Sequence, residues 1–411
     1  MNYSAAVADA DEASRLLVIF ILVLTAVVVT LGISIKLWRV RRRGPRVDAD
    51  TSWLTEEAGA RRAEAMLRER DPDFSLAGIE AHVRALHALL RESAAQGSMS
   101  PIQPWLSDAL HLRLVLERRL FGSSTLLSAA TPPLVGVLVL GLERSPSFQS
   151  LRVRVTARAD DGAMVSQEWV LLRRPGTTTA AQGLREGACP GCGAPLQLAQ
   201  TLRCAHCGAV VNSGVHDWVL VDVTQGAASL EGRVAPLDPH GLRALDGALS
   251  VESLEDRAAL TFWRWREAEY TGRPEAFEAL ASDAVVAQVG AAHRLGAGRE
   301  QPHVTTFRLR ALVLGDAQQA LVSAAWAGHG IDGGEVSAQQ VVFRFSRPLT
   351  ARTADAVGLS TARCPACLAF VDVANHRRCR YCDGALDAGW QLEEILPREA
   401  LPLLLQQARG G

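Results

Sequence analysis

Eight cysteines are the residues of this sequence best suited to chemistry, and all of them fall in CxxC pairs. They form two sets of four: Cys189, Cys192, Cys204 and Cys207, then Cys364, Cys367, Cys379 and Cys382. Both sets have the spacing C-x2-C-x11-C-x2-C. Four thiolates at such spacing are typical of a tetrahedral Zn²⁺ site. The sequence therefore predicts two zinc ribbons, over 186–212 and 361–385, that hold two structural Zn²⁺ ions.

Four thiolates fill the coordination shell, which is typical of a structural metal and leaves no open position for catalysis. Iron in a rubredoxin-like site is an alternative, but its knuckles usually lie farther apart. Thiol redox chemistry is another, but a redox CxxC normally opens a helix in a βαβ unit. His206 and His376 could replace a cysteine as ligands. Because each set already has four thiols, we expect both histidines to face solvent.

A ribbon that reads nucleic acid needs basic and aromatic side chains between its cysteines. The first ribbon offers Arg203 and His206 there. The second ribbon is richer in such residues: Phe370, His376, Arg377, Arg378, Arg380 and Tyr381. The formal net charge of the chain is −1, which argues against a generally basic surface. Nucleic acid is therefore disfavoured as a partner and is kept as an alternative for the second ribbon alone.

An uncharged stretch runs from Leu16 to Ile35, and these twenty residues can span about 30 Å of hydrocarbon as a helix. Three acidic residues precede it, Asp9, Asp11 and Glu12, and six basic residues follow it, Lys36, Arg39, Arg41, Arg42, Arg43 and Arg46. The positive-inside rule places the N-terminus outside and the remaining chain in the cytoplasm. A cleaved signal peptide is the alternative, but its basic residues would come first. A reducing cytoplasm also suits cysteines that bind metal.

The soluble part of the chain has an internal repeat. The sequence offset between Cys189 and Cys364 also relates Ser107-Asp108-Ala109 to Ser282-Asp283-Ala284, and we call it the repeat offset. One shared offset over so long a stretch predicts a tandem duplication. The Arg-rich and Ala-rich composition is typical of a GC-rich bacterial genome, so the predicted location is the bacterial inner membrane.

Both copies show the same predicted order of elements, helices first and strands after, which indicates an α+β fold. Copy 1 has predicted helices over 75–95 and 104–121, strands over 134–142, 151–157 and 164–173, the ribbon, and a last strand over 218–223. Copy 2 has predicted helices over 252–271 and 274–289, strands near 303–314, 319–327 and 336–346, the ribbon, and a last strand from Trp390. Each ribbon is thus an insertion between two strands.

These predictions divide the chain into consecutive segments. They are a short extracytoplasmic tail (1–15), a transmembrane helix (16–38), a basic juxtamembrane spacer (39–70), copy 1 (71–225), a linker (226–250), a degenerate copy 2 (251–400) and a C-terminal tail (401–411). The bilayer is the predicted partner of residues 16–38.

The stretch DPDFSLAGIEAHVRALHALL (Asp71–Leu90), followed by PWLSDALHLRL (Pro104–Leu114), resembles the Tim-forty-four-like domain family of inner-membrane translocase subunits. The resemblance covers roughly 70–223. Copy 2 matches more weakly, since it keeps Ser282-Asp283 but lacks the DPDF motif. The resemblance implies two cone-like domains, similar to nuclear-transport-factor-two-like and cystatin-like folds. It also implies protein binding or tethering at a membrane, and it carries over no catalytic residue.

Several other residues have side chains that could do chemistry. Asp71 and Asp73 could form a carboxylate pair, but we expect them to cap the following helix. Ser107 and Ser282 precede predicted helices and are interpreted as N-caps, because no histidine is spaced to activate them.

The aromatic group Phe262, Trp263 and Trp265 is interpreted as core packing, with a ligand cage as the alternative. Cone-like folds often hold an apolar pocket, so a small-molecule or lipid ligand, with or without enzymatic activity, stays a second hypothesis. The first hypothesis is a membrane-anchored, non-enzymatic tether or scaffold for protein partners at the cytoplasmic face, with protein transport as one role.

Overall fold

The computed structural model describes most of the chain from residue 49 onward. The described ranges are 49–122, 133–158, 162–179, 188–196, 204–225, 235–294, 300–330, 335–353, 381–383 and 389–410. The predicted transmembrane helix (16–38) lies outside them, and within them no helix has the length and apolar character needed to cross a bilayer. Residues Glu56–Gly411 form one compact unit, which contains both copies.

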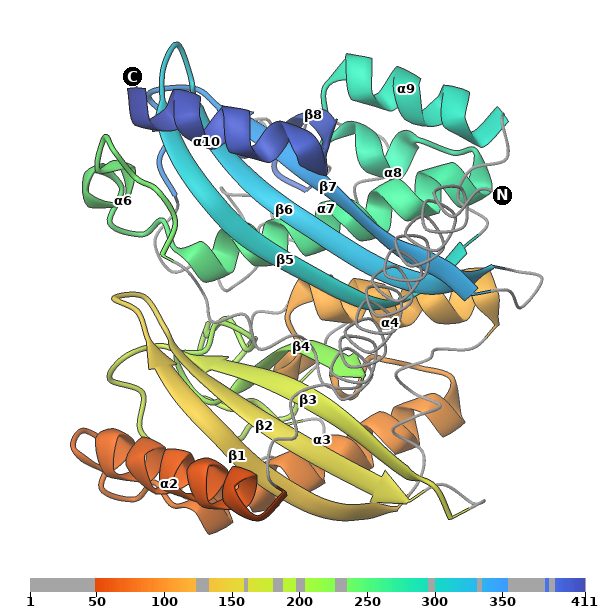
Figure 1. Cartoon of the computed structure of the whole chain (residues 1–411). Helices are drawn as coiled ribbons and strands as arrows, with labels where there is room; N and C mark the ends of the chain where they lie inside the picture. Colours follow the sequence, from red (N-terminus) through yellow and green to blue (C-terminus); the bar gives the residue numbers. More distant parts are fainter. Residues whose placement is uncertain are drawn as a thin grey trace, which may run out of the picture. The chain divides into compact units, whose positions relative to one another are not determined.

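Copy 1 consists of helices followed by a four-stranded antiparallel sheet (Figure 1). Its helical elements are α3 (Leu76–Gln96), the 3-10 helix η1 (Gln103–Trp105) and α4 (Asp108–Phe121). Its strands are β1 (Leu134–Arg144), β2 (Gln149–Arg158), β3 (Met164–Arg173) and β4 (Val219–Gln225). The strands pair in chain order, and the ribbon residues lie between β3 and β4 in the sequence, as predicted.

Copy 2 repeats this arrangement (Figure 1). Its helices are α7 (Val251–Thr271), α8 (Glu275–Glu278) and α9 (Asp283–Arg294), preceded by the short α6 (Leu242–Leu245). Its strands are β5 (Glu300–Leu314), β6 (Gln318–Gly330), β7 (Glu335–Arg347) and β8 (Gln391–Pro397), again paired in chain order. The α+β class predicted from the sequence is therefore confirmed.

The first long helix of each copy begins and ends in the same way. Ser75 caps α3 by accepting a hydrogen bond from the Gly78 N–H at 3.0 Å, and Ser250 does the same for α7. Each helix ends at a left-handed glycine, Gly97 with φ 78° and Gly272 with φ 71°. Glycine adopts this conformation without the steric cost of a Cβ atom, so both stops are encoded locally.

The prediction of one continuous second helix is wrong in both copies. In each copy the structure has two separate helical elements there. In copy 1 the chain extends at Leu106, which pairs with Leu220 of β4 between η1 and α4. In copy 2 Ala281 pairs with Leu392 of β8 between α8 and α9. A bridge to a strand distant in sequence has no local pattern, so helical periodicity alone predicted a continuous helix.

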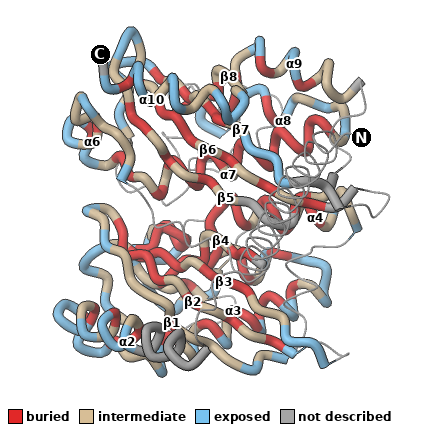
Figure 2. Tube along the Cα trace, in the orientation of Figure 1, coloured by how far each residue is buried: buried red, intermediate tan, exposed pale blue. Residues whose placement is uncertain are grey.

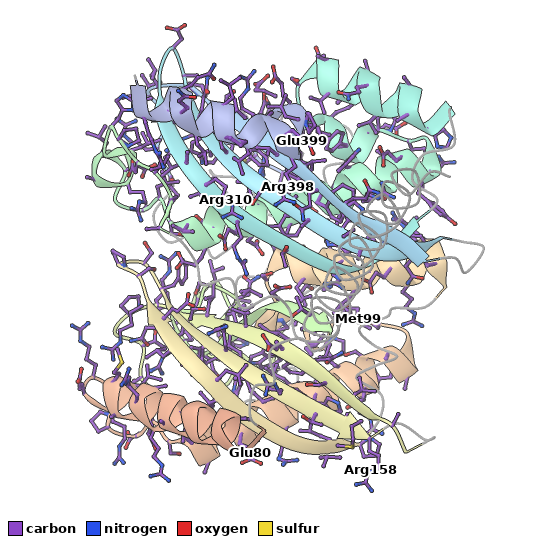
Figure 3. All side chains as sticks on the ribbon, in the orientation of Figure 1. Glu80, Met99, Arg158, Arg310, Arg398 and Glu399 are labelled. Atoms are coloured by element: carbon purple, nitrogen blue, oxygen red, sulfur yellow. The ribbon has the colours of Figure 1, made fainter. Side chains whose placement is uncertain are left out.

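The core of each copy lies between its helices and one face of its sheet (Figure 2). The predicted alternation along β2 is confirmed, since Leu151, Val153 and Val155 are buried. Figure 3 labels Met99, which is buried in the core of copy 1, and Arg158, which is exposed at the end of β2.

Two helices were not predicted. The helix α2 (Ala49–Arg68) lies within the predicted juxtamembrane spacer, and its small residues Ala60 and Ala63 pack into the core of copy 1. The helix α10 (Leu401–Gly410) lies in the predicted C-terminal tail, where Ala408 packs with Leu321 on the outer face of the copy 2 sheet. The α2 sequence is rich in charged residues and α10 has only 10 residues, so apolar periodicity is weak evidence for either helix before its partners are known.

Candidate functional site

The first four-cysteine set forms two matching turns. In one turn the Cys189 N–H donates to the Ala194 carbonyl at 2.8 Å, and in the other the Cys204 N–H donates to the Ala209 carbonyl at 2.8 Å. Each turn contains a left-handed glycine after its second cysteine, Gly193 with φ 73° and Gly208 with φ 71°. These turns are the two knuckles of the zinc ribbon that the cysteine spacing predicted.

The four sulfur atoms of these turns form one compact cluster. All of them lie within 4.8 Å of one another. The Cys189 and Cys207 Sγ atoms are 3.8 Å apart, and those of Cys192 and Cys204 are 3.7 Å apart. A tetrahedron with four Zn–S bonds of about 2.3 Å has edges of about 3.8 Å. The cluster can therefore hold one metal ion, and its dimensions are consistent with zinc.

The protein places the thiols in unlike electrostatic surroundings. Burial raises the pKa of Cys189, whereas N–H groups of Cys207 and His206 lower the pKa of Cys204. Metal binding requires all four as thiolates, so an ion must displace the protons that burial retains. His206 is exposed and is not part of the metal-binding group, as expected.

The second cysteine set lies mostly outside the described residues, which include Cys382 but not Cys364, Cys367 or Cys379. His376 also lies outside them. Asp383, which follows Cys382, has φ 58°, the left-handed conformation that Gly208 adopts at the equivalent position of copy 1. Aspartate tolerates this region better than most residues. The second zinc site stays a prediction.

A buried ion pair in copy 1 was missed by the sequence analysis. Asp71 does not cap α3; its Oδ2 accepts hydrogen bonds from Arg173 Nη1 and Thr179 Oγ1, both at 2.7 Å. Gln149 accepts from Arg173 Nε at 2.8 Å, and the guanidinium lies 4.5 Å from the Trp218 ring centroid. Burial alone raises the pKa of Asp71, but the bonds from Thr179 and Arg173 outweigh it and lower that pKa.

Copy 2 contains the same arrangement. Asp246 Oδ2 accepts from Arg347 Nη2 at 2.6 Å and from Thr353 Oγ1 at 2.8 Å. Gln318 accepts from Arg347 Nε at 2.9 Å, and the guanidinium lies 4.4 Å from the Trp390 ring centroid. Asp71 and Asp246 are separated by the repeat offset, but their partners Arg347 and Thr353 each lie one residue short of it, so the offset alone does not reveal the repeated network. The network joins the end of a β strand to neighbouring turns of the chain, and this position indicates a structural role.

The other residues that the sequence analysis considered for chemistry lie at helix starts, at the surface or in the core. Ser107 is the N-cap of α4, as predicted, and Asp73 is exposed. Ser282 directly precedes α9, but its buried hydroxyl makes no hydrogen bond. The aromatic group Phe262, Trp263 and Trp265 is buried, and the Phe262 ring contacts both tryptophans edge to face. These three side chains therefore pack in the core of copy 2.

The fold and the site define an α+β protein with two helix-and-sheet units and a four-cysteine cluster. No family model and no curated protein matches the chain. Among solved structures, one matching chain is described as an "Ntf2 like protein involved in plasmid conjugation". It has 8% sequence identity and a TM-score of 0.19, and the alignment covers 75% of this chain and 97% of that chain. A TM-score this low supports no further argument.

Proposed function

We propose that this protein is a membrane-anchored, non-enzymatic scaffold that presents two tandem α+β domains to protein partners at the cytoplasmic face of a bacterial inner membrane. A zinc ion in each ribbon stabilises the loop inserted into each sheet. Protein transport is the process in which the resemblance to Tim-forty-four-like domains places such a scaffold.

The metal has a structural role in this proposal. The cluster of Cys189, Cys192, Cys204 and Cys207 supplies four sulfur ligands, so its tetrahedral shell is complete without water or substrate. Structural zinc can contribute on the order of 10 kcal/mol to folding. That is enough to order a loop whose described residues form a small apolar cluster, Cys189, Cys204, Val211 and Leu196.

The observation that carries the proposal is a buried ion pair that recurs in both copies. Arg173 with Asp71 and Arg347 with Asp246 join the same elements in both copies, with both side chains of each pair at most 4% exposed. Groups held in this way connect segments of backbone and have no position from which to reach a substrate. Their repetition in both copies favours a scaffold.

The membrane part of the proposal is tested by fractionation and topology. The full chain and a chain lacking residues 1–46 are produced in the same bacterial cells. The full chain should remain with alkali-washed membranes, the shortened chain should be released, and a C-terminal reporter should be active only in the cytoplasm. A reporter active only outside the membrane refutes the topology.

The scaffold part is tested by crosslinking the full chain in native membranes and identifying proteins bound to it. The shortened chain is the matched control for membrane placement, and Cys189→Ser is the control for an intact ribbon. Protein partners that crosslink only when the chain is anchored in the membrane and its first ribbon is intact support the proposal. A purified chain that instead retains one lipid or metabolite, or that binds DNA with steep salt dependence, favours the corresponding alternative.

A further inference from the structure

Asn212 connects the cysteine cluster of copy 1 to the rest of its domain. Val211, directly before it, packs against Cys189 and Cys204. Ser213, directly after it, donates a hydrogen bond from its hydroxyl to the backbone of the same turn at 2.7 Å. Asn212 itself is 0% exposed. The folded ribbon therefore fixes the position of the Asn212 side chain.

The Asn212 amide holds both sides of the N-cap of α4. Its Nδ2 donates to the Leu106 carbonyl at 3.1 Å and to Asp108 Oδ1 at 3.0 Å. Between these two residues, Ser107 Oγ accepts the Leu110 N–H at 3.2 Å. A residue of the ribbon thus helps to orient the first turn of α4.

The first turn of α4 is also where copy 2 contacts copy 1. Ala109 of that turn packs into the core of copy 2, and the nearby Ser107 hydroxyl and Ala109 N–H partly offset the rise that burial causes in the pKa of Asp256 on α7. Farther along the same pair of helices, the Arg113 guanidinium lies 5.4 Å from the Trp263 ring centroid. Asp256 is 7% exposed and Trp263 is 2% exposed, so the contact excludes water. Its geometry depends on the orientation of α4.

We propose that metal binding by the copy 1 ribbon and the packing of the two copies are thermodynamically coupled, with Asn212 as the connection. A ribbon of this size folds when it binds metal, and the folded ribbon places Asn212 against the start of α4. Loss of the metal then loosens the contact between α4 and α7. Reciprocity requires that the packed interface also strengthens metal retention. This coupling does not depend on membrane anchoring or on protein partners.

The first experiment uses the full chain in detergent micelles and measures amide hydrogen exchange. In Asn212→Ala, amides of α7 and of the first turn of α4 should exchange about tenfold faster, with zinc content unchanged. Thr177→Ala is the matched control, because Thr177 Oγ1 bonds the Gly214 and Val215 carbonyls on the other side of the ribbon, both at 3.1 Å. It should leave α7 exchange unchanged. Equal effects of the two variants, or none from Asn212→Ala, overturn the coupling.

The second experiment reads the coupling in the opposite direction and remains informative if Asn212→Ala loses zinc or fails to fold. A Cys382→Ser background limits the measured zinc to the first ribbon. Within it, Asp256→Ala on α7 should lower zinc retention against a chelator about three- to tenfold. Unchanged retention shows that the interface and the metal are independent and refutes the proposal.

Discussion

The two copies have the same internal architecture but unlike outer helix surfaces. Their capped first helices begin at 76 and 251 and end at 96 and 271, so both ends are related by the repeat offset. Their strand bulges also correspond, after Val170 in copy 1 and after Arg344 in copy 2. Many residues of the two copies differ, but the contact between the copies includes an ion pair of Arg119 with Glu267 whose equivalents, Arg294 and Glu92, are the same residue types. The large apolar side chains at that contact, by contrast, occur in only one copy of each helix.

The contact between the copies is one-directional. In copy 1, α4 contributes Ala109, Leu112 and Leu116 to the core of copy 2. In copy 2, α9 has only Ala284, Ala287 and Ala291 at the equivalent positions. Alanine offers much less apolar area than leucine, so the contribution of Leu112 and Leu116 has no counterpart on α9.

The partner helix shows the reverse pattern. On α7, Asp256, Trp263 and Tyr270 face α4 and its end. The equivalent positions on α3 are the alanines at 81, 88 and 95. The large side chains of the contact on α7 therefore have no counterpart on α3. The following predictions test how far this division between shared interior and unlike surface holds.

The largest expected effect comes from the shared buried ion pair. Arg173→Ala or Arg347→Ala leaves a buried aspartate without its guanidinium partner, so each should lower the free energy of unfolding by about 3–5 kcal/mol. Arg84→Ala, which removes a surface pair with Glu80 at 2.7 Å, should cost less than about 1 kcal/mol. Denaturant unfolding monitored by circular dichroism measures all three. A loss below about 1 kcal/mol in either buried variant would show that the copies do not share this support.

The next effect separates the unlike surfaces. Trp263→Ala removes a buried ring at the contact between the copies, and we expect a loss of about 3 kcal/mol. Ala88 occupies the equivalent position on α3 and is exposed, so Ala88→Trp should change stability by less than about 0.5 kcal/mol. The same unfolding measurement applies. Comparable losses in the two variants would argue that α3 also packs against a partner.

A smaller effect is expected from pH. Burial, with repulsion from Asp108 and Asp222, raises the pKa of Asp256 to about 8. Between about pH 4 and pH 8 the folded chain keeps a proton that the unfolded chain has lost, so this residue lowers stability as pH rises. Asp256→Asn should remove that slope and be more stable than the parent above pH 8 by about 1–3 kcal/mol. Parallel stability curves for the two proteins between pH 5 and pH 9 would be inconsistent with this assignment.

The sequence predicted what depends on local spacing. Cysteine intervals set the two knuckles around Cys189 and Cys204, and alternation along β2 set its buried face. The ion pair of Asp71 with Arg173 joins residues 102 positions apart, so no local pattern predicted it. The DPDF motif favoured capping, but Ser75 is the cap. The repeat aligns Asp246 with Asp71 but does not reveal their long-range partners, because Arg347 lies one residue short of the offset from Arg173.

The contact between α4 and α7 shows the same limit. Ala109 and Leu112 were assigned to a helix but not to a surface, because a helix apolar on two faces does not reveal which face meets its own sheet. The structure assigns Leu110 and Leu114 to the core of copy 1, and Ala109 and Leu112 to the core of copy 2. Sequence predicted the elements, whereas their packing required the structure.

We propose that the first ribbon is a closed, structural four-sulfur metal site. Zinc K-edge X-ray absorption on the full chain carrying Cys382→Ser measures the ligands of this site. We expect four sulfur ligands at about 2.3 Å, and loss of zinc together with copy 1 folding in Cys189→Ser. A nitrogen or oxygen ligand in the first shell, or a Cys189→Ser chain that stays folded with its zinc, would contradict it.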